Sequence, residues 1–249
     1  MTDIWPTVHA ERQALADDLE HLTPEQWATQ SLCAEWDIHD VLAHLVATAK
    51  ITPWRFFTHF AAAGFDFDKS NANEVAAERA ADPIETLAEF RAVQLRRSSP
   101  PAPKDTRLVE AFVHGEDIRR PLGISRDYPQ AHVTRAIRLQ ARTSEAMGGG
   151  KTLVAGLTVT ATDTDFTLGT GPAVEGPAIS LLLAVSGRKS ALADLTGRGS
   201  RLSPSADSTL DLCGTSSPRM PEGADSPSQL TILYRINRTR IGRSRSVHA

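Results

Sequence analysis

A carboxylate and an imidazole lie four residues apart in the segment from Arg107 to Gly123, RLVEAFVHGEDIRRPLG. If this segment is helical, Glu110 and His114 project from the same face, one turn apart. An oxygen and a nitrogen placed in this way can bind Zn²⁺ or a similar divalent ion. Asp117 follows three residues after His114, on roughly the same stripe. It could be a further ligand, or its carboxylate could hold a ring N–H of His114 and fix the tautomer.

Two ligands hold a metal weakly, so a third would have to come from another helix. His44 is the best candidate, because it lies among apolar residues on or beside a stripe that we expect to pack inward. Three protein ligands with an open fourth position are typical of a catalytic site. Two alternatives stay open at this point. A Glu-x-x-x-His pair can be a weak surface contact, and His44 can be a hydrogen-bonded core residue.

Apolar spacing, cap residues and prolines place these side chains on helices. Asp37 is a predicted N-cap of the helix that carries His44, and Pro53 is expected to kink or end it. The polar segment DFDKSNAN is predicted to be a mobile connection. The expected helices cover about residues 4–21, a short turn from Pro24, 38–52, 54–64, 83–98, 106–123 and 130–147.

The pattern changes at Gly148. The segments LVAGLTVTATD and DFTLGTG predict two paired strands, and VEGPAISLLLAVSGR predicts a helix with a proline near its first turn. We therefore predict a helical bundle over residues 1–147 and a small α+β unit over residues 148–202. Residues 203–249 are rich in Ser, Pro and Arg and are expected to be a disordered tail. The basic end could also bind an anionic partner.

The composition bounds the class of protein. The chain has 249 residues, 41% of them hydrophobic, and a net charge of −3. This charge argues against nucleic acid or an anionic membrane as a partner. The longest apolar run, ISLLLAV, is too short to span a bilayer, and no signal peptide is evident. Two cysteines make no disulfide framework, and Cys33 is interpreted as packing rather than a nucleophile. We expect a soluble cytoplasmic protein, a monomer or a homodimer.

Two motifs carry a resemblance to a known family. SLCAEWDIHDVLAHLVAT resembles the second-helix motif of the mycothiol-dependent maleylpyruvate isomerase family, and EAFVHGEDIRRPLGI resembles its fourth-helix motif. The family belongs to the DinB-like superfamily of metal-binding four-helix bundles. The resemblance covers about residues 5 to 202, including the Gly-Arg pair after the last predicted helix. It implies an N-terminal DinB-like four-helix bundle followed by a small α+β C-terminal domain.

The resemblance also implies a site and a chemistry. The family's metal ligands fall on His44, Glu110 and His114, for a divalent ion that is most simply zinc. Asp117 would take part in catalysis, as a supporting or substrate-facing carboxylate. Arg120 would bind the cofactor or a substrate carboxylate, although the helix dipole explains a C-terminal arginine equally well.

The family's cosubstrate is the thiol mycothiol, whose metal-held thiolate attacks a small electrophile. Isomerisation of maleylpyruvate and S-transfer both begin with this nucleophile, so the ligands do not separate an isomerase from an S-transferase. The alternative is a non-catalytic metal-binding or thiol-binding protein, or a regulator, on the same fold.

Overall fold

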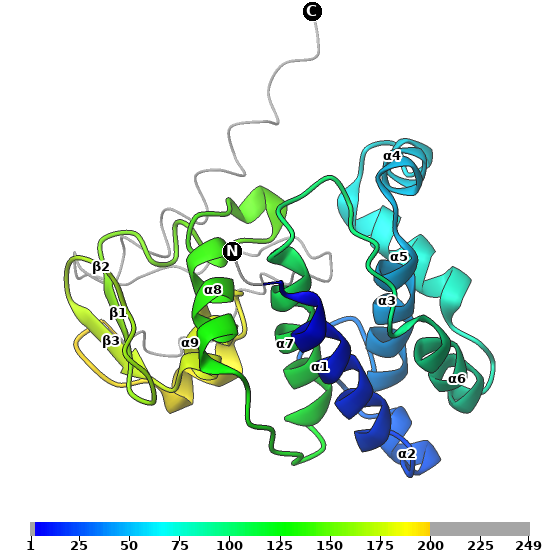
Figure 1. The fold of residues 1–249 in the computed structure, drawn as a ribbon, viewed down its shortest axis with the longest axis horizontal. Coiled ribbons are helices and arrows are strands. Elements are labelled where there is room, and N and C mark those ends of the chain that lie inside the picture. The colour runs from blue at the N-terminus through cyan, green and yellow to red at the C-terminus, as the bar shows by residue number, and fades with distance from the viewer. Residues whose placement is uncertain (1–2, 200–249) are drawn as a thin grey trace, which may run out of the picture.

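Four helices of the computed structural model, which describes residues 3–199, form a bundle (Figure 1). Helices α3 and α1 each pack against both α6 and α7, so α1 and α3 lie on opposite corners. This arrangement confirms the predicted four-helix bundle. The four helices are α1 (Trp5–Asp18), α3 (Ile38–Lys50), α6 (Pro83–Val93) and α7 (Thr106–Arg119).

Local sequence fixes where the helices begin. Asp37 caps α3, and Asp40 completes a capping box by accepting a hydrogen bond from the Asp37 backbone N–H. Thr23 and Gln26 form the same motif at the short helix α2 (Pro24–Trp27). The predicted break before Pro53 is confirmed, because α3 ends at Lys50 and α4 (Pro53–Ala62) starts there as a separate helix.

The segment DFDKSNAN is not a mobile connection, so that prediction was wrong. Helix α5 (Phe67–Glu78) runs through it and packs against α3. The Asp66 side chain caps the helix by accepting a hydrogen bond from the Lys69 N–H at 3.0 Å. Only Ser70 and Val75 are buried in α5. With so few apolar positions, the helix has almost no period that a sequence analysis could detect.

The C-terminal part forms a three-stranded sheet with the order β2-β1-β3. Strands β1 and β2 pair, as predicted, and they run antiparallel, whereas β3 runs parallel to β1. We had assigned the residues of β3 to a helix, which was wrong, because the helix starts only after Pro177. The elements are α8 (Gln130–Gln140), η1 (Glu145–Met147), β1 (Thr158–Ala161), β2 (Thr167–Gly169), β3 (Ala173–Gly176), α9 (Ala178–Val185) and η2 (Lys189–Asp194).

Two apolar cores share the helices α1 and α7. One also contains residues of α8, the sheet and α9, and the other also contains residues of α2, α3, α5 and α6. Figure 1 shows α8 and α9 side by side, between the bundle and the sheet. The boundary that we predicted at residue 148 stays a prediction, and the tail at 203–249 lies outside the described residues. No helix in the described part is long and apolar enough to cross a membrane.

Candidate metal centre

Helices α3 and α7 bring His44 and His114 together. Their ring centroids are 4.9 Å apart and the rings are nearly perpendicular, at 76°. The ring of Trp36 covers His44, with centroids 5.0 Å apart. Nδ1 of His44 is buried and has no hydrogen-bond partner among the described residues. Buried polar atoms are rarely left unbonded, so this nitrogen is available for a ligand.

Asp117 is the centre of a buried network on the other side of His114. One carboxylate oxygen, Oδ2, accepts from Nδ1 of His114 at 2.9 Å and from Nη2 of Arg188 at 2.7 Å. The other, Oδ1, accepts from Nε of Arg188 at 2.9 Å. The Cys33 thiol donates to Oδ2 at 3.3 Å and accepts from Nη2 of Arg188 at 3.3 Å. We call Cys33, His114, Asp117 and Arg188 the Asp117 network.

The charges in this network set the protonation states of the two histidines. Burial would raise the pKa of Asp117, but Arg188 and His114 outweigh it and hold that pKa below its usual range. Burial opposes a charge on His114, yet Asp117 and Cys33 raise its pKa to about 9. Burial lowers the pKa of His44 well below 6.5, and the nearby His114 and Arg107 add to this. His44 is therefore a neutral imidazole, the form that binds metals.

Glu110 lies between two buried arginines. Nη1 of Arg107 is 2.7 Å from Oε2, and Nη2 of Arg12 is 3.5 Å from Oε1. Backbone carbonyls anchor both arginines: Arg107 donates to Thr48 O at 3.1 Å and Arg12 to Arg96 O at 3.0 Å. Nη2 of Arg12 and Nε of Arg107 have no hydrogen-bond partner among the described residues. We call Arg12, Arg107 and Glu110 the Glu110 group.

The helical part of the chain matches a known family. Residues 8–119 match the family described as the mycothiol maleylpyruvate isomerase N-terminal domain. Residues 8–119 are a domain of this family.

Solved structures show the same fold over a longer stretch. Two crystal structures of mycothiol-dependent maleylpyruvate isomerase, one of a histidine-to-alanine mutant, superpose with TM-scores of 0.55 and 0.56. Each is 14% identical and covers 79% of this chain and 92% of the other. No curated protein matches the chain.

The three residues predicted to bind a metal do not all have the same surroundings. His44 and His114 face each other, whereas Glu110 is engaged by Arg107. An ionised carboxylate has about four lone-pair sites, so Glu110 retains acceptor capacity beside its arginines. The set His44, Glu110 and His114 stays a prediction.

A second group of metal-type side chains was not predicted. Within the described residues, the ligand atoms of Cys33, His114 and Asp117 lie within 4.8 Å of one another, and such a group could hold a metal ion. From its sequence context, Cys33 is expected to pack in the core and not to act as a nucleophile. The Gly-Arg pair that contains Arg188 belongs to the family resemblance, but the sequence gives the arginine no role.

The two arginines at the end of α7 are bound within the fold. Arg119 is fully buried and donates to Asp18 at 2.7 Å. Arg120 donates to Glu116 at 2.9 Å and to Asp194 at 2.8 Å, and its third nitrogen bonds Ser180. A substrate would have to displace one of these contacts. The binding role predicted for Arg120 stays a prediction.

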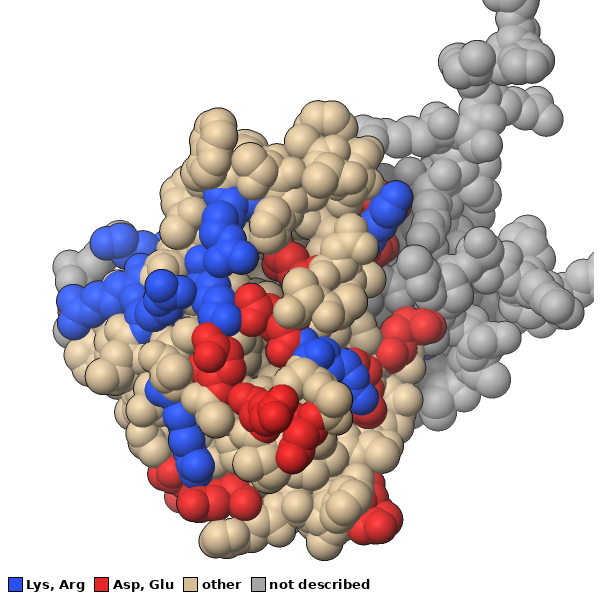
Figure 2. All heavy atoms as spheres, turned by 90° about the vertical axis from the view of Figure 1, so that its right-hand side faces the viewer, with Lys and Arg blue, Asp and Glu red and all other residues tan. Residues whose placement is uncertain are grey.

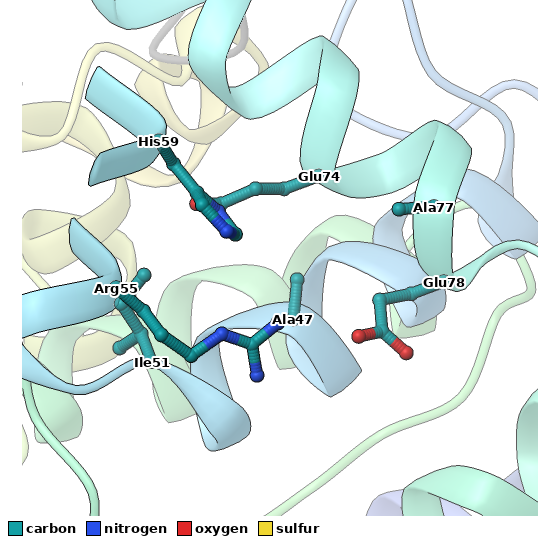
Figure 3. Close-up of a pocket in the computed structure, with 7 residues that line it drawn as sticks. All are labelled: Ala47, Ile51, Arg55, His59, Glu74, Ala77 and Glu78. Atoms are coloured by element: carbon teal, nitrogen blue, oxygen red, sulfur yellow. The ribbon is translucent and has the colours of Figure 1, made fainter. Parts of the chain in front are cut away.

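A groove between α3, α4 and α5 lies apart from the two histidines (Figure 3). His59 and Glu74 approach each other across it, with Nδ1 and Oε1 2.9 Å apart. His44 and His114 do not line it. The lining residues are Ala47, Ile51, Arg55, His59, Glu74, Ala77 and Glu78.

Helix α4, above this groove, buries none of its residues. Trp54 and Phe57 are exposed on it, and Figure 2 shows a mainly uncharged surface at the top of this face. Below it, acidic and basic side chains lie next to one another. Neither surface gathers metal ligands in the way that the space around His114 does.

Proposed function

We propose that the chain is a divalent-metal-binding, mycothiol-dependent enzyme that carries out isomerisation or S-transfer on a small electrophilic substrate. The observation that carries this proposal is the meeting of His44 and His114 in a domain of the maleylpyruvate isomerase family. The structural neighbours are mycothiol-dependent maleylpyruvate isomerases, so maleylpyruvate is the first substrate to test.

His44, Glu110 and His114 would hold the ion. Three observations support this set: the unbonded Nδ1 of His44, the carboxylate of Asp117 on Nδ1 of His114, and the spare acceptor capacity of Glu110. One open position would remain for a thiol. A bound divalent cation would lower the thiol pKa below its ordinary value of about 8.5 and so supply a thiolate nucleophile.

The chain's own residues prepare this site. Asp117 keeps a proton on Nδ1 of His114, so Nε2 would be the ligand nitrogen. Because the pKa of His114 is raised to about 9, a metal would bind there by displacing the Nε2 proton. Trp36 covers His44 and limits access of water from its side. These residues act in the same way whether the added thiol leaves again, as in an isomerisation, or stays attached, as in a transfer.

Metal content tests the ligand set. We expect the purified chain to carry about one Zn²⁺ or similar ion per molecule, as most catalytic zinc sites do. His44→Ala and His114→Ala should each abolish stoichiometric binding. His39→Ala is the matched control, because His39 is buried on the same helix but bonds Thr86. Absence of metal from the wild-type protein would contradict the proposal.

Turnover separates an enzyme from a binding protein. The metal-loaded chain would be given mycothiol and a panel of electrophiles that includes maleylpyruvate, and both thiol consumption and isomerisation would be followed. The proposal expects activity that disappears in His114→Ala. A metal-loaded wild-type protein without activity on the whole panel would favour the non-catalytic alternative.

A further inference from the structure

Two ligand sets share His114, and the position of Arg188 discriminates between them. The group Cys33, His114 and Asp117 has one sulfur, one nitrogen and one oxygen donor, a mixture that suits zinc. A cation already lies against it, however. Nη2 of Arg188 contacts both Sγ of Cys33 and Oδ2 of Asp117. A guanidinium is always charged, so a second cation at these atoms would meet direct repulsion. The same holds at Oε2 of Glu110, 2.7 Å from Arg107, but the other oxygen of Glu110 has only the longer contact of 3.5 Å with Arg12, whereas Arg188 bonds both oxygens of Asp117.

We propose that Arg188 is a positioning residue of the metal centre and that the Asp117 network is its support, not its ligand set. Arg188 donates hydrogen bonds to both oxygens of Asp117, and this bidentate contact fixes the plane of the carboxylate. Asp117 in turn holds Nδ1 of His114, so the opposite nitrogen, Nε2, is directed away from the network. The relevance of this to catalysis rests on the proposed function, whereas the orientation of His114 does not.

The backbone around Arg188 is built to hold it in place. Helix α9 ends at Val185, and Gly187, with a φ of 84°, reverses the chain two residues later in a conformation that favours glycine. The backbone N–H of Arg188 then donates to Leu183 O at 2.9 Å, and its Nη1 donates to Ser186 O at 3.1 Å. The side chain is 1% exposed. Its guanidinium therefore projects from the C-terminal unit into the bundle with little freedom.

This contact makes the C-terminal unit part of the site. Arg188 follows α9, and Asp117 lies on α7, so the orientation of His114 depends on how the two parts pack. A histidine ring is nearly symmetric in shape, and without a fixed carboxylate it could turn and present Nδ1 instead of Nε2. A lysine at position 188 would keep the charge but could not bond both oxygens in one plane.

The first measurement uses the metal-free full chain. Nδ1–H of His114, in a buried bond to a carboxylate, should give a slowly exchanging downfield proton resonance in the NMR spectrum. We expect this resonance to be lost or broadened in Arg188→Gln and shifted in Arg188→Lys. The matched control is Asp194→Asn, which removes another contact between the same two parts, to Arg120, without touching His114.

The second measurement is Zn²⁺ affinity by competition with a chelator. Loss of a supporting group around a metal ligand typically weakens binding about 10- to 100-fold. We expect a loss in this range for Arg188→Gln, a smaller loss for Arg188→Lys and none for Asp194→Asn. If Arg188→Gln does not fold, Arg188→Lys carries the test, and the shifted resonance with weaker binding is the expected result.

The outcomes distinguish the positioning role of Arg188 from the proposed enzymatic function. A normal resonance and unchanged Zn²⁺ affinity in Arg188→Gln, or in Arg188→Lys when only that variant folds, would overturn the positioning role. Tighter binding in Arg188→Gln would also overturn it, because the guanidinium would then be blocking a metal site. If the wild-type chain binds no metal but the resonance is present and depends on Arg188, the positioning of His114 stands and the proposed function fails.

Discussion

Helix α7 carries three buried carboxylates, and two of them, Glu110 and Asp117, lie about two turns apart in different surroundings. Asp117 is fully buried and accepts from His114, Cys33 and Arg188, with both oxygens in use. Glu110 has one close ion pair, with Arg107, and a longer one with Arg12. Among the described residues, Nε of Arg107 has no hydrogen-bond partner, and Nη2 of Arg12 has only its long ion pair with Glu110.

The difference indicates different tasks on one helix. A carboxylate whose two oxygens both accept hydrogen bonds from buried groups is held rigidly, so it suits a supporting role. A carboxylate with spare acceptor capacity, next to polar groups that are not yet bonded, suits a place where something else binds. On this basis we propose that Asp117 supports His114 and that Glu110 is a ligand of the ion.

The largest expected effect comes from Asp117→Asn. The change removes the charge opposite Arg188 in a site without solvent, and breaking a buried ion pair typically costs about 3–5 kcal/mol. Urea unfolding monitored by circular dichroism would measure the change in the free energy of unfolding. A loss below about 1 kcal/mol would contradict the conclusion that the Asp117 network holds its carboxylate more rigidly than the Glu110 group does.

Glu110→Gln should lower the free energy of unfolding less than Asp117→Asn does, but it should weaken Zn²⁺ binding strongly. The amide oxygen can still accept from Arg107, and both arginines keep their backbone carbonyls, so we expect a loss of about 2 kcal/mol. Zn²⁺ affinity should fall by at least about 100-fold, because a ligand is gone. The same unfolding and chelator titrations measure both. A variant that keeps wild-type affinity would remove Glu110 from the ligand set.

His39 is a second buried histidine, but its hydrogen-bond partner is a hydroxyl and not a carboxylate. Its pKa is lowered, whereas the pKa of His114 is raised. His39 is buried on α3 and bonds the Thr86 hydroxyl at 2.8 Å, and burial with the charge of Arg79 lowers its pKa from 6.5 to about 4. In the unfolded chain His39 binds a proton more tightly than in the folded chain. The stabilisation that the neutral, buried His39 contributes is therefore present above pH 6.5 and is lost as the pH falls toward 4.

We expect the wild-type chain to lose about 1 kcal/mol through His39 between about pH 7 and pH 5.5. His39→Gln keeps a side chain that can bond Thr86 but does not titrate, so this part of the loss should disappear. Urea unfolding of both proteins at the two pH values would show it. An equal pH dependence in the two proteins would contradict the assignment.

The smallest expected effect is that of Asp194→Asn. Its partner Arg120 is partly exposed and keeps its ion pair with Glu116, and such surface pairs are worth about 0–1 kcal/mol. We expect a melting temperature within a few degrees of wild type and normal metal content. A large loss of either would mean that the contact between the two parts, and not Arg188 itself, supports the centre.

The sequence predicted the elements that carry strong local signals. The capping residues Thr23, Asp37 and Asp82 each begin a helix as expected. The apolar stripe of α3 correctly placed His44 against the bundle interior, and the three-residue spacing from His114 to Asp117 anticipated their contact. These features depend on residues close in sequence, so helical geometry alone relates them.

The sequence could not predict the features that tertiary packing creates. Arg188 and Cys33 are 155 residues apart, and no local period relates them. Arg12 reaches Glu110 from another helix, and its position in α1 looks like that of any surface arginine. The missed strand β3 has the same cause. A side chain at Gly176 would press on Cδ2 of Leu195 and on the Asp194 carbonyl, which is a constraint set by packing and not by the strand's own sequence.

X-ray absorption spectroscopy of the zinc-loaded full chain tests the central claim most directly, because nitrogen, oxygen and sulfur ligands give different distances. If His44, Glu110 and His114 hold the ion and the Asp117 network supports it, the first shell will contain only nitrogen and oxygen, at about 2.0–2.2 Å. A zinc–sulfur distance of about 2.3 Å in the protein without added thiol would contradict the account. It would make Cys33 a ligand and Arg188 a residue that the metal displaces.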